Sequence, residues 1–98
     1  MAITVLFDFQ VRPGELPKAE SVITRLLVDT RAFDGCIALD VTRDLTDPTH
    51  FVFLERWDSA GAYQAYAAWR ATPEGSSGLR ELLVEPPRIT QLGADPAF

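Results

Sequence analysis

Apolar residues recur at every second position in three segments of the chain, a spacing that is typical of β-strands. These segments span 3–11, 36–43 and 51–57, and residues 88–92 predict a short last strand. In the first of them, one face is wholly apolar and consists of Ile3, Val5, Phe7, Phe9 and Val11. The opposite face mixes polar and apolar residues in each of the first three segments. The pattern therefore predicts a sheet with one covered face and one open face.

Apolar residues in two other segments recur every three or four positions, which is the interval of an amphipathic α-helix. The first segment spans 16–31, has Pro17 in its first turn and is expected to end near Phe33. Its predicted buried stripe consists of Ala19, Val22, Ile23 and Leu26. The second segment spans 60–71 and follows Ser59, a residue type that commonly caps helix N-termini. Two helices are thus expected on the apolar face of the sheet.

The order of these segments is β-α-β-β-α-β, which is the order of a ferredoxin-like α+β sandwich. The sequence therefore predicts a four-stranded antiparallel sheet with its helices on one face. Between the second helix and the last strand, the Gly/Ser-rich residues 74–78 predict a flexible loop and residues 79–84 a short helix. The 98 residues suit a single domain, with a core at about 2–92 and a tail at 93–98.

The mixed face of the predicted sheet is too apolar to remain in water and too polar to form a dry core. It consists of Thr4, Leu6, Asp8, Gln10, Ala38, Asp40, Thr42, Val52, Leu54 and Arg56. A second sheet packed against it would bury the apolar residues and leave polar groups to pair across the contact. We therefore expect a homodimer in which two sheets face each other.

Composition and charge exclude several classes of partner. The formal net charge is −5 and no basic stripe is present, so nucleic acid is not an expected partner. No apolar run approaches the roughly 20 residues that a membrane span needs. Cys36 is the single cysteine, and a chain without an internal disulfide is expected in the reducing cytoplasm.

The sequence offers no set of metal ligands. The single histidine, His50, stands at the turn before the third strand and is expected to be a solvated turn residue. Without cysteines or carboxylates at ligand spacing, one histidine does not make a metal site. Neither a metal nor another cofactor is therefore predicted.

Three sequence motifs resemble one known family. The run LERWDS at 54–59, followed by a helix rich in alanine and tyrosine, is similar to the antibiotic biosynthesis monooxygenase family of dimeric α+β barrels. VRPG at 11–14 and FDGCIALDVTRDLTDPTHF at 33–51 also resemble it. The resemblance implies a dimer and a pocket between sheet and helices in each subunit. The family includes cofactor-free oxygenases of phenols and quinols, haem-degrading enzymes and proteins with no known activity.

The same resemblance separates this chain from part of that family. Trp57 matches the tryptophan that ends the third strand and often lines the pocket. Tyr66 stands where many members have a histidine, and Phe7 stands where haem-degrading members have an asparagine. Both departures remove the haem-degrading pattern, and the first weakens a standard oxygenase assignment.

Aromatic residues and one carboxylate are the candidate site residues. Phe7, Trp57, Tyr63 and Trp69 are predicted to bind a substrate, and Tyr66 and Glu55 to be catalytic. Trp and Tyr carry a polar atom that needs a partner when buried, so their clustering favours a partly polar cavity over a dry core. Glu55 lies two residues before Trp57, so strand alternation turns it towards the helices. There it would act as a base, belong to a structural hydrogen-bond network or sit at a strand bulge.

These residues lead to one functional hypothesis and two alternatives. The first is a cofactor-independent monooxygenase that acts on an aromatic or polyketide-like small molecule of the quinol or phenol type. Such a substrate supplies its own electrons, so the protein has to bind it, promote its deprotonation and exclude bulk water. The alternatives are a non-catalytic dimeric module that binds a small molecule, and an isomerase or cyclase on the same scaffold.

Overall fold

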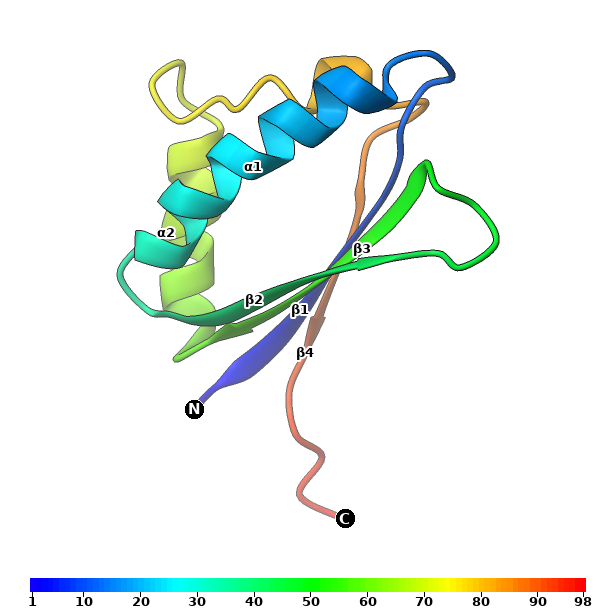
Figure 1. The fold of residues 1–98 in the computed structure, drawn as a ribbon. Coiled ribbons are helices and arrows are strands. Elements are labelled where there is room, and N and C mark those ends of the chain that lie inside the picture. The colour runs from blue at the N-terminus through cyan, green and yellow to red at the C-terminus, as the bar shows by residue number, and fades with distance from the viewer.

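The fold is a four-stranded antiparallel sheet with two helices on one face (Figure 1). The computed structural model describes all residues from 1 to 98. Its elements are β1 (Ile3–Gln10), α1 (Leu16–Ala32), β2 (Cys36–Arg43), β3 (His50–Trp57), α2 (Ala60–Arg70), the 3-10 helix η1 (Arg80–Leu82) and β4 (Arg88–Leu92). The strand order is β2-β3-β1-β4, and each neighbouring pair is antiparallel. The predicted ferredoxin-like α+β fold is confirmed.

The core lies between the central strands and the helices, on the face that the alternation predicts. Val5 and Phe9 of β1 and Phe51 and Phe53 of β3 are at most 3% exposed. From α1, the predicted stripe Ala19, Val22, Ile23 and Leu26 is buried against them, together with Thr30. Trp57, Val5 and Tyr63 form a second, smaller buried cluster towards the start of α2. None of the helices is both long and apolar enough to cross a membrane.

The other face of the sheet is uncovered. Strand register places Leu6 of β1 opposite Leu54 of β3 and opposite Thr90 of β4 on this face. Leu54 is 38% exposed and Leu92 is 45% exposed. Both helices lie on the opposite side, so nothing in the chain shields these leucines from solvent (Figure 1).

Strand β2 departs from the simple alternation. Cys36 is paired with Trp57 and Ala38 with Arg56, so Ile37 is the extra residue of a β-bulge. The alternation predicts Ile37 on the covered face and Cys36 on the mixed face. That prediction is wrong, because the bulge reverses the order: Ile37 is 57% exposed and Cys36 packs beside Trp57.

The prediction that His50 is a solvated turn residue is also wrong. His50 is the first residue of β3, and its ring bridges two carboxylates. Nδ1 is 2.9 Å from Asp44 Oδ2 in the turn, and Nε2 is 2.7 Å from Asp8 Oδ1 on β1. These contacts, that with Asp44 above all, raise the pKa of His50. The histidine therefore holds the β2–β3 turn against β1.

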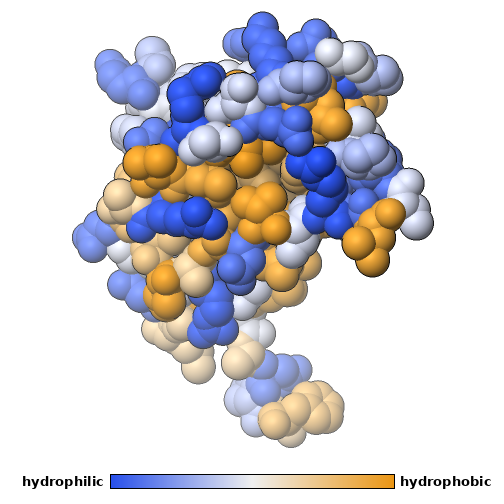
Figure 2. Space-filling model, in the orientation of Figure 1, coloured by the Kyte–Doolittle hydropathy of each residue, from blue (hydrophilic) through white to orange (hydrophobic).

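The segment between α2 and β4 is more ordered than its composition predicts. Its helix is a single turn, η1, rather than the expected 79–84. Gly75, in the segment predicted to be flexible, is buried and hydrogen-bonded at both its N–H and its C=O. Residues 72–79 are thus held against the end of α2, and we call them the roof segment. In the orientation of Figure 1, hydrophobic side chains gather where α1 meets the strands, bordered by hydrophilic ones (Figure 2).

Candidate active site

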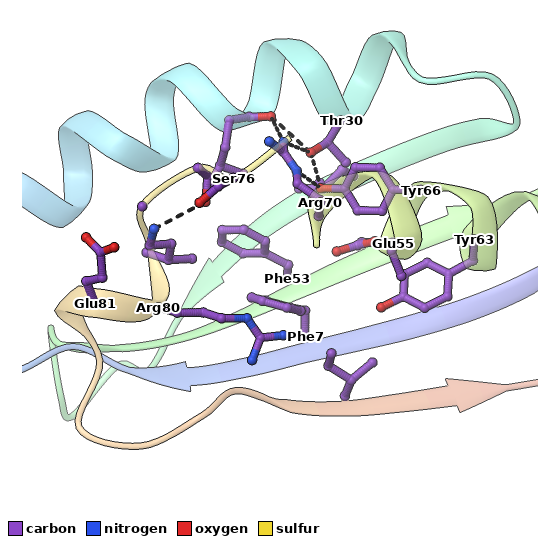
Figure 3. Close-up of a pocket in the computed structure, with 17 residues that line it drawn as sticks. Phe7, Thr30, Phe53, Glu55, Tyr63, Tyr66, Arg70, Ser76, Arg80 and Glu81 are labelled. Atoms are coloured by element: carbon purple, nitrogen blue, oxygen red, sulfur yellow. Dashed lines mark hydrogen bonds between the residues drawn. The ribbon is translucent and has the colours of Figure 1, made fainter. Parts of the chain in front are cut away.

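A cavity of about 140 Å³ lies between the helix-facing side of the sheet, α2 and the roof segment. Phe7 and Phe53 form its apolar floor, and three side chains of α2 form one wall: Tyr63, Tyr66 and Arg70. Residues 76–81 close the opposite side (Figure 3). The roof segment and the start of η1, which sequence reasoning treated as a connection, thus shape the cavity.

Glu55 is a buried carboxylate that opens into this cavity. The residue is 3% exposed, and its Oε1 accepts a hydrogen bond of 2.9 Å from the indole Nε1 of Trp57. Every side-chain polar atom that is closed off from solvent has a partner. Oε2 forms no hydrogen bond, so it must reach open space, and Glu55 borders the cavity. Burial raises the pKa of Glu55, while the Trp57 hydrogen bond and the charge of Arg70 act in the opposite direction.

Tyr66 is held in a closed hydrogen-bond network. Thr30 donates its hydroxyl proton to the carbonyl oxygen of Leu26 at 2.9 Å, so Tyr66 donates to Thr30 Oγ1 at 2.6 Å. The Tyr66 hydroxyl in turn accepts from Nε of Arg70 at 2.8 Å. Burial raises the pKa of Tyr66 above its ordinary value of 10.0. A phenol with these partners is a poor base and a good anchor for the cavity wall.

Arg70 joins three elements around the cavity, a role that sequence reasoning missed. Besides Tyr66, its guanidinium donates to the carbonyl oxygens of Leu26 on α1 at 3.0 Å and of Gly75 in the roof segment at 3.1 Å. The side chain is 17% exposed, and its nearest carboxylate oxygen, on Asp29, is 4.0 Å away. The one signal in the sequence was its position four residues after Tyr66, on the same side of a helix.

Tyr63 and Arg80 have free polar groups at the cavity. Tyr63 is 5% exposed and its hydroxyl forms no hydrogen bond, so by the same argument this hydroxyl reaches the cavity. Burial, and then the negative charge of Glu55, raise the pKa of Tyr63 to about 12. Arg80 of η1 reaches across from the other side and forms no ion pair (Figure 3). Sequence reasoning did not single out Arg80.

The two tryptophans lie outside the cavity lining. Trp57 is fully buried and packs behind Glu55, with its ring centroid 4.9 Å from that of Tyr66. Trp69 packs against Phe33, and the guanidinium carbon of Arg70 lies 4.8 Å from the centroid of the Trp69 ring. Of the six predicted site residues, the structure brings Phe7, Glu55, Tyr63 and Tyr66 together around the cavity. Substrate contact by Trp57 and Trp69 has no geometric support.

This arrangement suits proton transfer to or from a bound ring. Two carboxylates line the cavity, Glu55 and Glu81. Glu81 on η1 is exposed, whereas Glu55 is buried with one oxygen free, so Glu55 is the better placed acid–base group. Aromatic side chains surround it and the cation of Arg70 is near. His50, between Asp8 and Asp44, is not part of the lining, and no three His, Cys, Asp or Glu side chains are placed to hold a metal ion.

Several solved structures share this fold over nearly the whole chain. A conserved protein from Methanosarcina mazei superposes with a TM-score of 0.86 at 24% identity, over 97% of this chain and 94% of that one. A protein from Mycobacterium tuberculosis superposes with a TM-score of 0.80 at 25% identity, over 100% of both chains. SnoaB, a cofactor-independent oxygenase from Streptomyces nogalater, superposes with a TM-score of 0.79 at 20% identity, over 95% and 92%.

Sequence comparison identifies the family of this chain but no individual curated relative. None of the curated protein sequences matches this chain. The family model for antibiotic biosynthesis monooxygenase, however, matches residues 2–76, which include β1 to α2 and the first part of the roof segment. The chain belongs to the antibiotic biosynthesis monooxygenase family.

Proposed function

We propose that the protein is a cofactor-independent monooxygenase that oxidises a phenolic or quinol-type aromatic molecule. The observation that carries the proposal is the free oxygen of Glu55 in a cavity with aromatic walls. Burial brings the pKa of this carboxyl group closer to neutrality, which makes it a stronger base than a surface glutamate. The structural similarity to SnoaB, a cofactor-independent oxygenase, supports the same reaction class.

The reaction needs a base, a ring and molecular oxygen. Glu55 accepts a proton from the acidic methylene group of an anthrone-type substrate, and the resulting anion is a delocalised phenolate. This anion transfers electrons to dioxygen, a C–O bond forms, and the peroxide takes up the proton from Glu55. Loss of the second C–H proton together with cleavage of the O–O bond gives a carbonyl group and water. In sum, one methylene group and one dioxygen molecule give one carbonyl group and one water molecule, which balances without a further reductant.

The volume of the cavity limits how much of a substrate molecule it can enclose. A cavity of about 140 Å³ is close to the roughly 150 Å³ that holds one benzene ring in an engineered apolar site. One ring therefore fits beside Glu55, and further rings would extend past Arg80 at the mouth. The Tyr63 hydroxyl and the Arg80 guanidinium are free to bind an oxygen of the substrate, and Arg80 adds a positive charge where negative charge develops.

Oxygen uptake in the presence of anthrones and hydroquinones tests the proposal. We expect consumption of one dioxygen molecule for each anthrone converted to anthraquinone, at a rate well above buffer. Turnover without oxygen uptake would instead assign an isomerase or cyclase, which uses the same base for proton transfer alone. A ligand that raises the Tm and is recovered unchanged would assign a binding module. Either result overturns the monooxygenase proposal.

We also propose that the protein forms a homodimer through its open sheet face. Leu6, Leu54 and Leu92 lie on that face, and the last two are more than a third exposed. Light scattering should give about twice the chain mass of 10.9 kDa. Leu54→Arg places a charge in the contact and should give the mass of one chain. Leu45→Arg is the matched control, because Leu45 is fully exposed on the β2–β3 turn, and its mass should not change. A wild-type mass of one chain would exclude the dimer.

A further inference from the structure

Trp57 and Glu55 form one unit on strand β3. They are two residues apart on the same face, and the indole N–H donates to Glu55 Oε1 at 2.9 Å. The indole is held in place, because Trp57 is fully buried and packs against Val5, Tyr63, Phe33 and Tyr66. A rigid donor therefore fixes one carboxylate oxygen.

Fixing one oxygen also determines where the other one lies. A glutamate side chain on its own has several rotamers and would spend part of its time away from the cavity. With Oε1 bound to Trp57, the Oε2 atom is left facing the cavity, where Figure 3 shows the Glu55 carboxylate beside Tyr66. A hydrogen bond from a neutral N–H to a carboxylate also favours the ionised form, which burial disfavours.

We propose that Trp57 is the positioning residue of the proposed reaction: its indole N–H holds the Glu55 carboxylate by one oxygen so that the other accepts the substrate proton. The inference rests on the proposed function only in naming Glu55 as the base. Trp57 acts through Glu55 and does not touch the substrate, since it lies behind the cavity lining.

The charged and titratable groups around Glu55 are Tyr63, Tyr66 and Arg70 of α2, Cys36 of β2, and Arg80 and Glu81 of η1, which line the same cavity. The pKa values of both tyrosines are raised above 10.0 and that of Cys36 is raised above 9.0 by burial. Thr30 on α1 and Phe7 and Ile89 on β1 and β4 carry no ionisable group. The Trp57 N–H bonds to Glu55 and not to Glu81, so a shift of its resonance at acid pH that Glu55→Gln abolishes reports Glu55.

The first experiment needs no activity. In the ¹H–¹⁵N spectrum of the wild-type protein, we expect the indole resonance of Trp57 to shift with pH as Glu55 ionises. The indole of Trp69 is an internal control, because it forms no hydrogen bond with a carboxylate and should stay fixed over that range. Glu55→Gln should abolish the shift. A Trp57 resonance that does not titrate, or that titrates equally in Glu55→Gln, overturns the inference.

The second experiment measures turnover as a function of pH in Trp57→Phe. Loss of the indole donor removes a hydrogen bond that stabilises the ionised carboxylate, so the pKa of Glu55 rises. The acid side of the pH–rate profile should therefore move to higher pH by about one to two units, which is the size of a lost hydrogen bond to a charged group. A purely structural role would lower activity at all pH values and leave the limb in place, which would overturn the inference. If no substrate is turned over, the proposed function fails while the indole titration still decides the role of Trp57.

Discussion

Replacing Glu55 by glutamine is expected to lower turnover of an anthrone or hydroquinone by about 100-fold or more, because general-base catalysis typically contributes 10²–10⁴. Glutamine has nearly the same shape, and its amide oxygen still accepts the Trp57 N–H, so the fold should be kept. What is lost is the proton acceptor in the cavity. Initial rates of oxygen uptake, measured with ligand-induced changes in Tm, separate this loss from loss of binding.

The matched control for Glu55→Gln is Glu74→Gln. Glu74 lies in the roof segment, is exposed and does not border the cavity, so the same change of charge there should alter turnover by less than about twofold. If Glu55→Gln kept a third or more of the wild-type rate with an unchanged pH profile, Glu55 would not be the base. Proton removal would then have to be assigned to solvent.

The fold could be predicted from the sequence because its signals are local. Alternation in β1 and β3 identified the buried face residue by residue, and the helical spacing of Ala19 to Leu26 identified the stripe that packs on it. Strand β2 shows the limit of this reasoning. The bulge at Ile37 depends on how β2 pairs with β3, and a one-residue insertion leaves the local pattern of apolar residues intact.

The site was predictable to a different degree for each residue. Glu55 was identified as inward-facing from strand alternation alone, and the structure places it 3% exposed at the cavity. Tyr66 was predicted to be catalytic, but its contacts with Thr30 and Arg70 come from another helix and the next turn, and no local pattern shows them. Arg80 was not predicted, because its place in the cavity lining depends on the tertiary position of η1 and not on a local sequence pattern.

Trp57 illustrates why a family position does not by itself define a role. The sequence motif places a tryptophan at the end of β3, and the resemblance implied that it lines the pocket. In the structure its indole lies behind Glu55, Tyr63 and Tyr66, and its only hydrogen bond to a lining residue is the one to Glu55. The residue type and position were predictable, whereas the direction of the ring depends on packing against Val5, Phe33 and Tyr63.

The glycine and serine content of residues 74–78 predicted a flexible loop, whereas the roof segment is ordered, and Gly75 shows why. A methyl group at its Cα would lie 1.9 Å from the carbonyl oxygen and 2.6 Å from the carbonyl carbon of Trp69. Both atoms belong to the backbone, so a side-chain rotation cannot make room. Glycine is needed here for close approach of two backbone segments, and not for flexibility.

Gly75→Ala is therefore expected to destabilise the protein by about 3 kcal/mol, at the upper end of the range for overpacked sites. In a domain of this size that corresponds to a fall in Tm of about 10 °C or more at fixed protein concentration. The roof segment must shift, which breaks the contact between Arg70 and the Gly75 carbonyl oxygen. Because residues 76–81 line the cavity, ligand binding should weaken together with stability.

Gly93→Ala is the control for Gly75→Ala, since nothing lies within 4 Å of a Cβ at Gly93. It should change stability by less than about 0.5 kcal/mol and leave ligand binding unaltered. Denaturant unfolding of both variants measures this difference. The dependence of the unfolding free energy on denaturant concentration must be equal in the two variants before their unfolding midpoints are compared. If the Gly75→Ala midpoint matched that of the wild type, the backbone at Gly75 would be free to move away from Trp69. The roof segment would then be a mobile lid, as the glycine and serine content of 74–78 first suggested, and substrate would enter by displacing it.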